Sequence, residues 1–348
     1  MKILYGVQAT GNGHITRARA LLPELLQQGI KVDFMFSGRP QAQLFDMEMF
    51  GHYRWANGFT FTTARGKVQR LATLKHLKPI TFWRDVRQLD LSGYDLVLTD
   101  FEPVTAWAAK RQGVLSVGLA RQYALRYPLA EKQSALWLNT AIQCFAPAQH
   151  MLGVHWQPDF PDLLPPLLPE TSIKPQYYPA DTRQRPFILV YLPFEDTSVV
   201  MNWLKHFPSW HFKLYSNITE LRSEQNVTLL PLSRSTFPGD LQHCSGVICN
   251  SGFGLCSEAL ISGKKMLIKP LQGQTEQAYN SYTLVKMAKA LQFDTFNPDV
   301  LQDWLSRPPA TAYPLPQPAK AIARWLKQGC NVPVSELAAS IWQGSRTI

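Results

Sequence analysis

Two short glycine-rich segments carry the first indication of chemistry. Residues 11–14 read GNGH and residues 250–254 read NSGFG, and each stands between an expected strand and an expected helix. Glycine lets a ligand approach the backbone closely, and the first amides of a helix suit an anion. We interpret both segments as candidate phosphate sites; the alternative is that their glycines only make tight turns.

Side chains that suit ribose and sugar hydroxyls follow the second segment. Glu258 stands one helical turn beyond Gly254, and residues 272–277 read QGQTEQ, with Asn280 one turn later. Carboxylates and amides form hydrogen bonds with hydroxyl groups. A surface glutamate that favours the helix dipole and a capped helix start are the structural alternatives for these residues.

A nicotinamide cofactor is disfavoured. The dinucleotide fingerprint GxGxxG is not met, because Thr16 stands where the third glycine belongs. Ser37, Gly38 and Arg39 follow the second expected strand, where such proteins carry an acidic residue for the ribose.

The elements that must position these residues alternate between apolar strands and amphipathic helices. A helix is expected at residues 15–28, ended by Gly29. Strands are expected at residues 2–7, 30–36, 95–99, 114–118, 187–192, 246–250 and 265–269. This alternation predicts parallel sheets, and hence an α/β protein with two Rossmann-like domains facing across a cleft.

Length and proline content divide the chain. A chain of 348 residues is longer than one hydrophobic core usually supports. We expect Rossmann-like domains at residues 1–156 and 187–310, joined by a proline-rich linker at 157–186 and followed by C-terminal helices at 311–348.

Composition narrows the class of protein. The net charge of +10 favours an anionic partner, which nucleic acid, a membrane face or a phosphorylated substrate would each satisfy. The five cysteines are odd in number and form no CxxC pair, which argues against a disulfide framework or structural zinc. The sequence shows neither a signal peptide nor a long apolar stretch, so a cytoplasmic location is expected.

Taken together, the motifs resemble those of the MurG-like glycosyltransferases of the GT-B superfamily. The resemblance rests on the order, spacing and strand–helix context of residues 11–15, 250–260 and 263–280. The first turn has one glycine fewer before His14 than the turn of that family. The resemblance implies the GT-B fold, with an N-terminal acceptor domain and a C-terminal donor domain.

The resemblance also implies a co-substrate. This is a nucleotide diphosphate sugar, with UDP the expected nucleotide, and no separate cofactor is expected. Glu258 would bind the ribose. The residues expected at the diphosphate and the donor sugar are Gly11, Gly13, Ser251, Gly252, Phe253, Gly254, Gln274, Glu276 and Gln277.

The reaction implied by the resemblance is direct displacement with inversion at the anomeric carbon, which requires a base. His14 is the first candidate, because histidine as a residue type titrates near neutral pH. Asp100 and Glu102 are the second candidates, since they follow a strand and would face the same cleft. One of them would alternatively orient or charge-stabilise His14, and Asp100 would alternatively cap the helix that begins near Pro103.

The charge of the leaving diphosphate must be neutralised. In GT-B enzymes helix amides and basic side chains usually do this, so no metal is expected, in agreement with the lack of a DxD triad near a strand end. Arg121 and Lys269 are candidate helpers.

A basic segment interleaved with apolar residues points to the acceptor. Its basic residues are Arg65, Lys67, Arg70, Lys75, Lys78, Arg84 and Arg87. Such a segment suits peripheral contact with an anionic membrane and a lipid-linked or glycan acceptor. A phosphorylated acceptor, or simply a solvated helix over the core, would also explain it.

Three other functions remain open. A UDP-sugar 2-epimerase would share the two-domain plan but would need no second substrate. A nucleic-acid-binding protein is less expected, because the chain carries no recognised nucleic-acid motif. The third alternative is a transferase-like protein that only binds and senses a nucleotide sugar.

Overall fold

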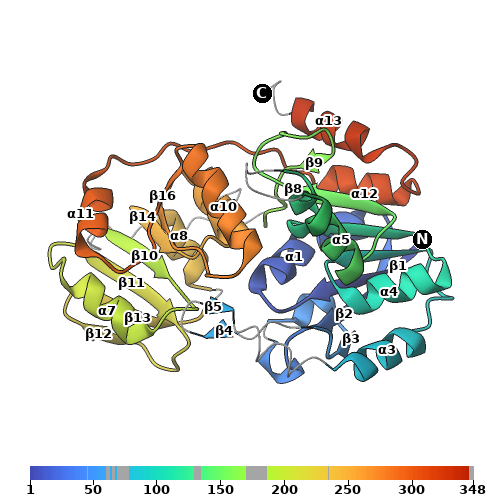
Figure 1. Cartoon of the computed structure of the whole chain (residues 1–348), viewed down its shortest axis with the longest axis horizontal. Helices are drawn as coiled ribbons and strands as arrows, with labels where there is room; N and C mark the ends of the chain where they lie inside the picture. Colours follow the sequence, from blue (N-terminus) through green and yellow to red (C-terminus); the bar gives the residue numbers. More distant parts are fainter. Residues whose placement is uncertain are drawn as a thin grey trace. The chain divides into compact units, whose positions relative to one another are not determined.

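The protein was analysed as a computed structural model. It describes residues 1–44, 46–59, 78–128, 138–169, 186–233 and 235–344, together with the backbone of residues 63–64, 67–68 and 135–137. The chain divides into two compact units (Figure 1). Unit 1 comprises residues 1–62, 70–169 and 315–348, and unit 2 comprises residues 63–69 and 170–314.

Unit 1 is built on a parallel sheet. Its described strands are β1 (Lys2–Gln8), β2 (Lys31–Ser37), β3 (Tyr53–Ala56), β6 (Leu96–Asp100), β7 (Ser116–Ala120), β8 (His150–Val154) and β9 (Leu163–Leu164). They lie in the order β3-β2-β1-β6-β7-β8-β9. The chain leaves β1 in one direction to form β2 and β3, and returns to the other side of β1 to form β6. Beyond the carboxyl ends of β1 and β6 is therefore the point where ligands bind in folds of this kind.

Helices flank this sheet, as parallel pairing of buried strands requires. They are α1 (Asn12–Gln27), α3 (Pro79–Gln88), α4 (Pro103–Gln112), α5 (Ala135–Phe145), α12 (Ala319–Lys327) and α13 (Val334–Gly344), with short 3-10 turns η1 (Gln41–Gln43), η2 (Glu48–Phe50) and η3 (Gln122–Arg126). Helix α1 buries Ala18, Leu21, Leu22 and Leu25 on one face. It begins three residues earlier than the apolar pattern suggested, so His14 lies within its first turn.

Unit 2 has a similar strand order, to which an antiparallel strand is added at one edge. Its described strands are β10 (Phe187–Tyr191), β11 (His211–Ser216), β12 (Arg222–Glu224), β13 (Val227–Pro231), β14 (Gly246–Cys249), β15 (Lys265–Ile268) and β16 (Ala290–Gln292). Their order is β12-β13-β11-β10-β14-β15-β16, and all pairs except β12 with β13 are parallel. The direction of chain progression reverses between β10 and β14, which is the counterpart of the β1–β6 position in unit 1.

The helices of unit 2 are α7 (Thr197–Lys205), α8 (Phe237–His243), α9 (Phe253–Ile261), α10 (Thr275–Lys286) and α11 (Pro298–Ser306). A large apolar cluster fills the space between β10, β11, β13 and the helices α7 and α11. A two-stranded ribbon, β4 (Thr63–Ala64) with β5 (Lys67–Val68), belongs to the same unit.

The C-terminal segment of the chain belongs to unit 1. Helix α12 packs on α1, and α13 packs on β9, where the Trp342 indole nitrogen donates to the Leu163 carbonyl at 2.7 Å. Residues 157–169, within the proline-rich stretch, also belong to unit 1 and include β9 at the edge of its sheet. An edge strand tolerates neighbouring prolines because one side of it needs no hydrogen bonds.

Part of the basic segment lies outside the described residues. This holds for Arg65, Arg70 and Lys75, while of Lys67 only the backbone is described, within β5. Among the residues that are described, no helix has the length and apolar character needed to cross a membrane.

Candidate active site

The carboxyl ends of β1 and β6 bring His14 and Asp100 together. Asp100 is the last residue of β6 and is paired in register with Val7 of β1, while His14 lies in the first turn of the helix that follows β1. The His14 Nδ1 atom lies 2.6 Å from Asp100 Oδ1. The carboxylate is completely buried, whereas the histidine side chain keeps 13% of its surface exposed.

Arg17 completes this cluster. Its Nε donates to Asp100 Oδ2 at 2.6 Å and its Nη2 donates to Oδ1 at 2.5 Å, so the guanidinium grips both carboxylate oxygens. The same Nη2 lies 3.0 Å from His14 Nδ1. On the other side of the imidazole, the Gln122 amide nitrogen lies 3.5 Å from His14 Nε2.

These charges set the protonation of the cluster. Burial acts to raise the pKa of Asp100, but the charges of Arg17 and His14 and their hydrogen bonds outweigh it, so the pKa is lowered. Burial, and next the Asp100 carboxylate, raise the pKa of Tyr5 well above its ordinary value. Asp100 is therefore ionised and accepts hydrogen bonds, and an imidazole with its proton on Nδ1 can donate one of them.

Glu102 has a different role from Asp100. It is the N-cap of α4: its Oε1 accepts from the Val104 amide at 2.9 Å and its Oε2 from the Thr105 amide at 2.7 Å. Ser37 Oγ donates to the same carboxylate at 2.7 Å. The helix cap that the sequence also allowed at Asp100 is thus formed by Glu102, directly before Pro103 at the first helical position. This leaves the Asp100 carboxylate for His14 and Arg17.

The loops that follow β14 and β15 are joined in unit 2. Ser251 Oγ donates to the Gln277 carbonyl at 2.8 Å, and the Asn280 side chain donates to the Ser251 carbonyl at 2.9 Å. The Gln277 side chain accepts from the Leu271 amide at 2.9 Å. Ser251, Gln277 and Asn280 therefore shape the site by holding the two loops together, and their polar groups are engaged within the protein.

Packing against the described residues does not require a glycine at Gly252, where α9 begins. Gly252 is the N-cap of α9, supplies no side-chain cap and has an extended conformation, with φ at −68°. A Cβ atom added at Gly252, Gly11 or Gly13 would meet no atom within 4 Å, whereas one at Gly6 would lie 2.0 Å from Thr105 Oγ1. Packing explains Gly6, but it does not explain the other three.

The remaining candidate donor residues lie around these loops. Phe253 is buried in the first turn of α9, whereas Gly254 and Glu258 on the same helix are partly exposed. Gln274 is the N-cap of α10 and Glu276 lies in its first turn, both partly exposed. Gln274 forms no side-chain cap, and its Oε1 has no hydrogen-bond partner among the described residues.

The two basic helpers occupy different surroundings. Lys269 follows β15, and its Nζ lies 3.0 Å from Glu195 Oε1 in an ion pair whose members are both more than nine-tenths buried. Glu195 follows β10, so this pair lies near the strand-order reversal of unit 2. Arg121 follows β7 in unit 1 and donates to the Val154 carbonyl at 3.3 Å.

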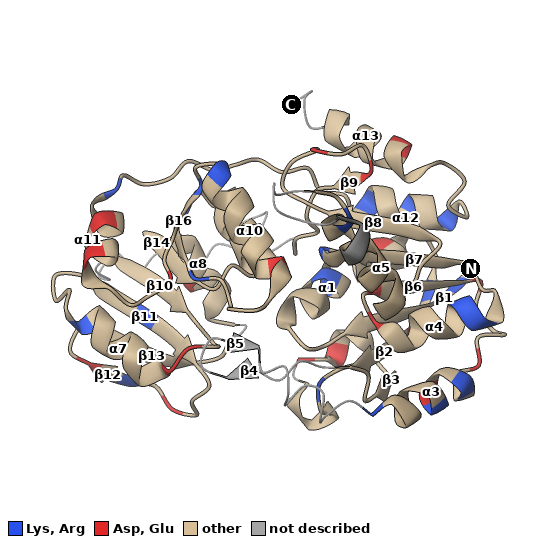
Figure 2. Cartoon of the chain, in the orientation of Figure 1, with Lys and Arg blue, Asp and Glu red and all other residues tan. Residues whose placement is uncertain are grey.

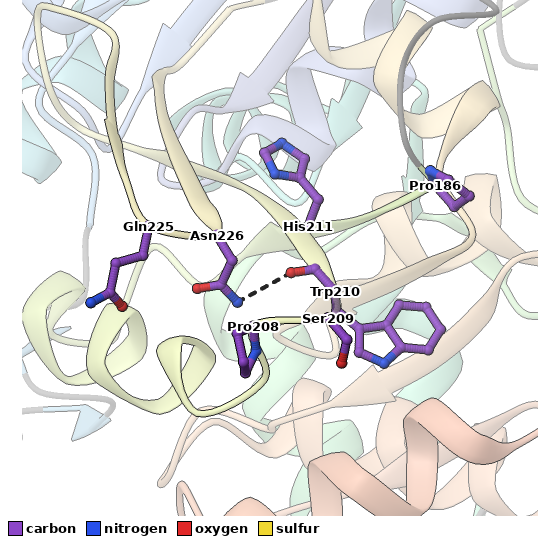
Figure 3. Close-up of a pocket in the computed structure, with 7 residues that line it drawn as sticks. All are labelled: Pro186, Pro208, Ser209, Trp210, His211, Gln225 and Asn226. Carbon is purple, nitrogen blue, oxygen red and sulfur yellow. Dashed lines mark hydrogen bonds between the residues drawn. The ribbon is translucent and has the colours of Figure 1, made fainter.

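A shallow pocket of about 540 Å³ lies elsewhere in unit 2. It is lined by Pro186, Pro208, Ser209, Trp210, His211, Gln225 and Asn226 (Figure 3). These residues stand at the amino ends of β10, β11 and β13, whereas the glycine loop follows the carboxyl end of β14. The pocket therefore lies at the amino ends of the strands, and the candidate donor loops lie at their carboxyl ends. The Asn226 amide that borders it donates to three carbonyls and holds the turn in place.

Sequence reasoning missed Arg17, Gln122 and Glu195. The spacing of His14 and Arg17, three residues apart, places them on one helix face and could have suggested a pair. Gln122 follows β7 in unit 1 and Glu195 follows β10 in unit 2, and neither gave a local signal in the sequence. In the described part of the chain, no three His, Cys, Asp or Glu side chains gather as metal ligands would.

The fold is similar to that of solved glycosyltransferases. It is similar to the glycosyltransferase SnogD from Streptomyces nogalater, at 15% identity over 99% of both chains and a TM-score of 0.60. It is similar to Arabidopsis thaliana UGT89C1 complexed with UDP, at 15% identity over 98% of this chain and 99% of the other, with a TM-score of 0.59. Acinetobacter baumannii MurG matches at 14% identity over 88% and 90% of the chains, with a TM-score of 0.50.

These likenesses confirm the expected GT-B fold, with two Rossmann-like domains. A family model described as glycosyl transferase family 1 matches residues 1–309. The chain belongs to this family. None of the curated proteins compared matches it.

Replacing Asp100 with Asn should destabilise the protein, because it leaves Arg17 buried without its counter-charge. We expect the free energy of unfolding at pH 7, from urea denaturation followed by circular dichroism, to fall by about 3–5 kcal/mol. Because the folded-state pKa of Asp100 is lowered, its contribution is present above the unfolded value of 3.8 and is lost as pH falls through the folded value. The difference between wild type and variant should therefore shrink below about pH 4.

Asp303→Asn is the matched control, since Asp303 pairs with Arg307 on the surface. Its loss should stay within about 1 kcal/mol. A loss at Asp100 no larger than this would contradict the buried network.

Proposed function

We propose that the protein transfers a sugar, with inversion, from a nucleotide diphosphate sugar to a hydroxyl group of a lipid-linked or glycan acceptor. UDP is the expected nucleotide. The observation that carries the proposal is the His14–Asp100 pair, 2.6 Å apart at the carboxyl ends of β1 and β6. A buried carboxylate beside a partly exposed imidazole is the arrangement of a general base with its orienting group.

His14 is the base in this reaction. With Nδ1–H donated to Asp100, Nε2 carries the free lone pair and takes the proton of the acceptor hydroxyl. The acceptor oxygen attacks the anomeric carbon from the side opposite the diphosphate, forming one C–O bond as the other breaks. The diphosphate leaves with the bonding electrons, and the anomeric configuration is inverted.

Unit 2 holds the donor. The first turn of α9, opened by Gly252, faces the diphosphate with backbone amides, and Glu258 one turn further accepts hydrogen bonds from the ribose diol. Gln274 and Glu276 bind the sugar hydroxyls, while Gln277 fixes the loop that carries them. The backbone amides at the start of α9 stabilise the charge of the leaving diphosphate, so the proposed mechanism includes no metal. The charge of Lys269, the other candidate for this role, is balanced by Glu195. The similarity to a UDP-bound glycosyltransferase supports the choice of nucleotide.

Helix α3 is the part of unit 1 that suits an anionic membrane surface. Its buried face is formed by Phe82 and Val86, whereas Ile80 is 85% exposed and Trp83 is 40% exposed. Arg84 and Arg87 are exposed on the same face, at helical spacing from Ile80 and Trp83. Basic residues alternate with an acidic one along α3 in Figure 2. Exposed large apolar side chains flanked by arginine are typical of peripheral membrane contact.

Replacing Glu258 with Ala should weaken UDP binding without unfolding the protein. Loss of charge-assisted hydrogen bonds to a ribose costs about 1.5–3 kcal/mol, which corresponds to an affinity about 10-fold to 100-fold lower in calorimetry. Glu220→Ala, which removes an exposed carboxylate from the same unit, should leave affinity unchanged. Equal affinities of the wild type and Glu258→Ala for UDP would show that Glu258 does not bind the ribose.

Replacing His14 with Ala should lower turnover by about 10²–10⁴-fold, the usual contribution of a general base. Affinity for the nucleotide, measured separately by calorimetry, should change little, because unit 2 binds it. His52→Ala, at an exposed histidine of unit 1, serves as the control. Turnover that survives in His14→Ala would show that another group takes the proton.

The double substitution of Ile80 and Trp83 by Ser should weaken membrane binding by about 10-fold or more, since burial of each large apolar side chain is worth about 1.5–3 kcal/mol. The measurement is co-sedimentation with vesicles containing phosphatidylglycerol, compared with vesicles of phosphatidylcholine alone. Val199→Ser, at an exposed apolar residue of α7, is the control. If the wild-type protein does not co-sediment with the anionic vesicles, the proposed membrane-binding role of α3 is wrong.

A further inference from the structure

Arg17 belongs to the same cluster as His14 and Asp100, although accepting the substrate proton does not require it. Arg17 is 6% exposed and makes two hydrogen bonds to the Asp100 carboxylate, at 2.6 Å and 2.5 Å. We propose that Arg17 is a positioning residue whose permanent charge takes the place of a proton in this cluster, so that His14 is free to act as a base at neutral pH. The inference rests on the proposed function of His14.

The geometry makes Arg17 the counter-charge of Asp100. A guanidinium stays protonated under all ordinary conditions, and its planar fork fits the two oxygens of a carboxylate. Its Nη2 is also 3.0 Å from His14 Nδ1, on the same side of the imidazole as Asp100. The guanidinium alone already balances the charge of the carboxylate, so the cluster needs no second positive charge.

The other groups around the cluster do not compensate the carboxylate. Tyr5 on β1 and Tyr123 in η3 are neutral, because burial and the charge of Asp100 raise the pKa of both phenols. Gln122 is uncharged, and the Glu102 carboxylate is engaged by the first turn of α4. His14 and Arg17 form the short hydrogen bonds to the Asp100 side chain, at 2.5–2.6 Å.

Without Arg17, the cluster would have to gain one proton to balance the buried charge. If the proton sat on Asp100, the carboxyl group would donate to Nδ1 and the imidazole proton would move to Nε2. If it sat on the imidazole, both ring nitrogens would carry hydrogen. The two groups titrate as a coupled pair, and in either form Nε2 has no lone pair for the substrate. Raising the pH would remove this proton and restore the base.

The first experiment measures the pH dependence of kcat/KM for Arg17→Met, Arg17→Lys and Arg19→Met. In Arg17→Met the acidic limb of the profile of kcat/KM against pH should move to higher pH by about 1–3 units, the usual effect of one close charge. Activity that is low at pH 7 should then recover at higher pH. Arg17→Lys keeps the charge and should keep a limb close to that of the wild type.

Arg19→Met is the matched control. Arg19 is on the same helix, but its Nη2 donates to the Asp46 carbonyl and its guanidinium lies over the Phe50 ring. Its replacement removes the same charge without touching Asp100, so the acidic limb should stay in place. An Arg17→Met enzyme that is equally impaired at every pH, or not impaired at all, would overturn the inference.

The second experiment needs no activity and so separates this inference from the proposed function. In protein labelled with ¹⁵N-histidine, the His14 signals are identified by their absence in His14→Gln and followed against pH. The neutral imidazole with its proton on Nδ1 should form at a higher pH in Arg17→Met than in the wild type. Identical titrations would overturn the role of Arg17 even if transfer activity is found, and a shifted titration would support it even if no transfer is found.

Folding is controlled by a double variant. If circular dichroism shows that Arg17→Met does not fold, then Arg17→Met combined with Asp100→Asn should fold, because the buried negative charge is gone. Failure of this double variant to fold would show that Arg17 supports the structure by packing, and would overturn its role as a counter-charge.

Discussion

A carboxylate that is removed entirely from water must be compensated by its neighbours, and this constraint governs the centre of unit 1. Asp100 ends a central strand, and both of its compensating partners, His14 and Arg17, come from the first turns of α1. The need to satisfy one buried charge therefore fixes the start of α1 against the sheet. Helix α12, near the end of the chain, packs on the same helix.

The glycines differ in whether neighbouring atoms would leave room for a side chain. At Gly6, Gly118 and Gly246 a Cβ atom would lie closer than 3 Å to a neighbouring side chain, so packing alone requires glycine there. Gly11, Gly13 and Gly252 have no such neighbour, and none of them has a positive φ. At these three positions neither packing against the described residues nor the backbone conformation requires glycine. A substrate that approaches the backbone at both helix starts would require it.

The fold was predictable because it rests on local patterns. Apolar strands followed by glycine turns and amphipathic helices predicted two Rossmann-like domains, and this is confirmed. The site was less predictable, because its contacts join distant segments. Asp100 and Glu102 both precede Pro103 and look alike in sequence, yet one turns toward α1 and the other caps α4. The packing of the C-terminal helices on unit 1 likewise depends on tertiary contacts that no local pattern reveals.

The two units place different chemistry at the same topological position. At the strand-order reversal of unit 1 the structure concentrates charge: a buried carboxylate, a guanidinium and an imidazole. Around the corresponding loops of unit 2 it supplies backbone amides and neutral side chains that join the loops, together with one buried ion pair, Lys269 with Glu195. Proton transfer requires a group whose protonation is controlled by nearby charge, whereas binding a diphosphate requires donors that stay fixed as charge develops. In the proposed function, the repeated fold would therefore provide a single framework in which one unit moves a proton and the other holds the leaving group.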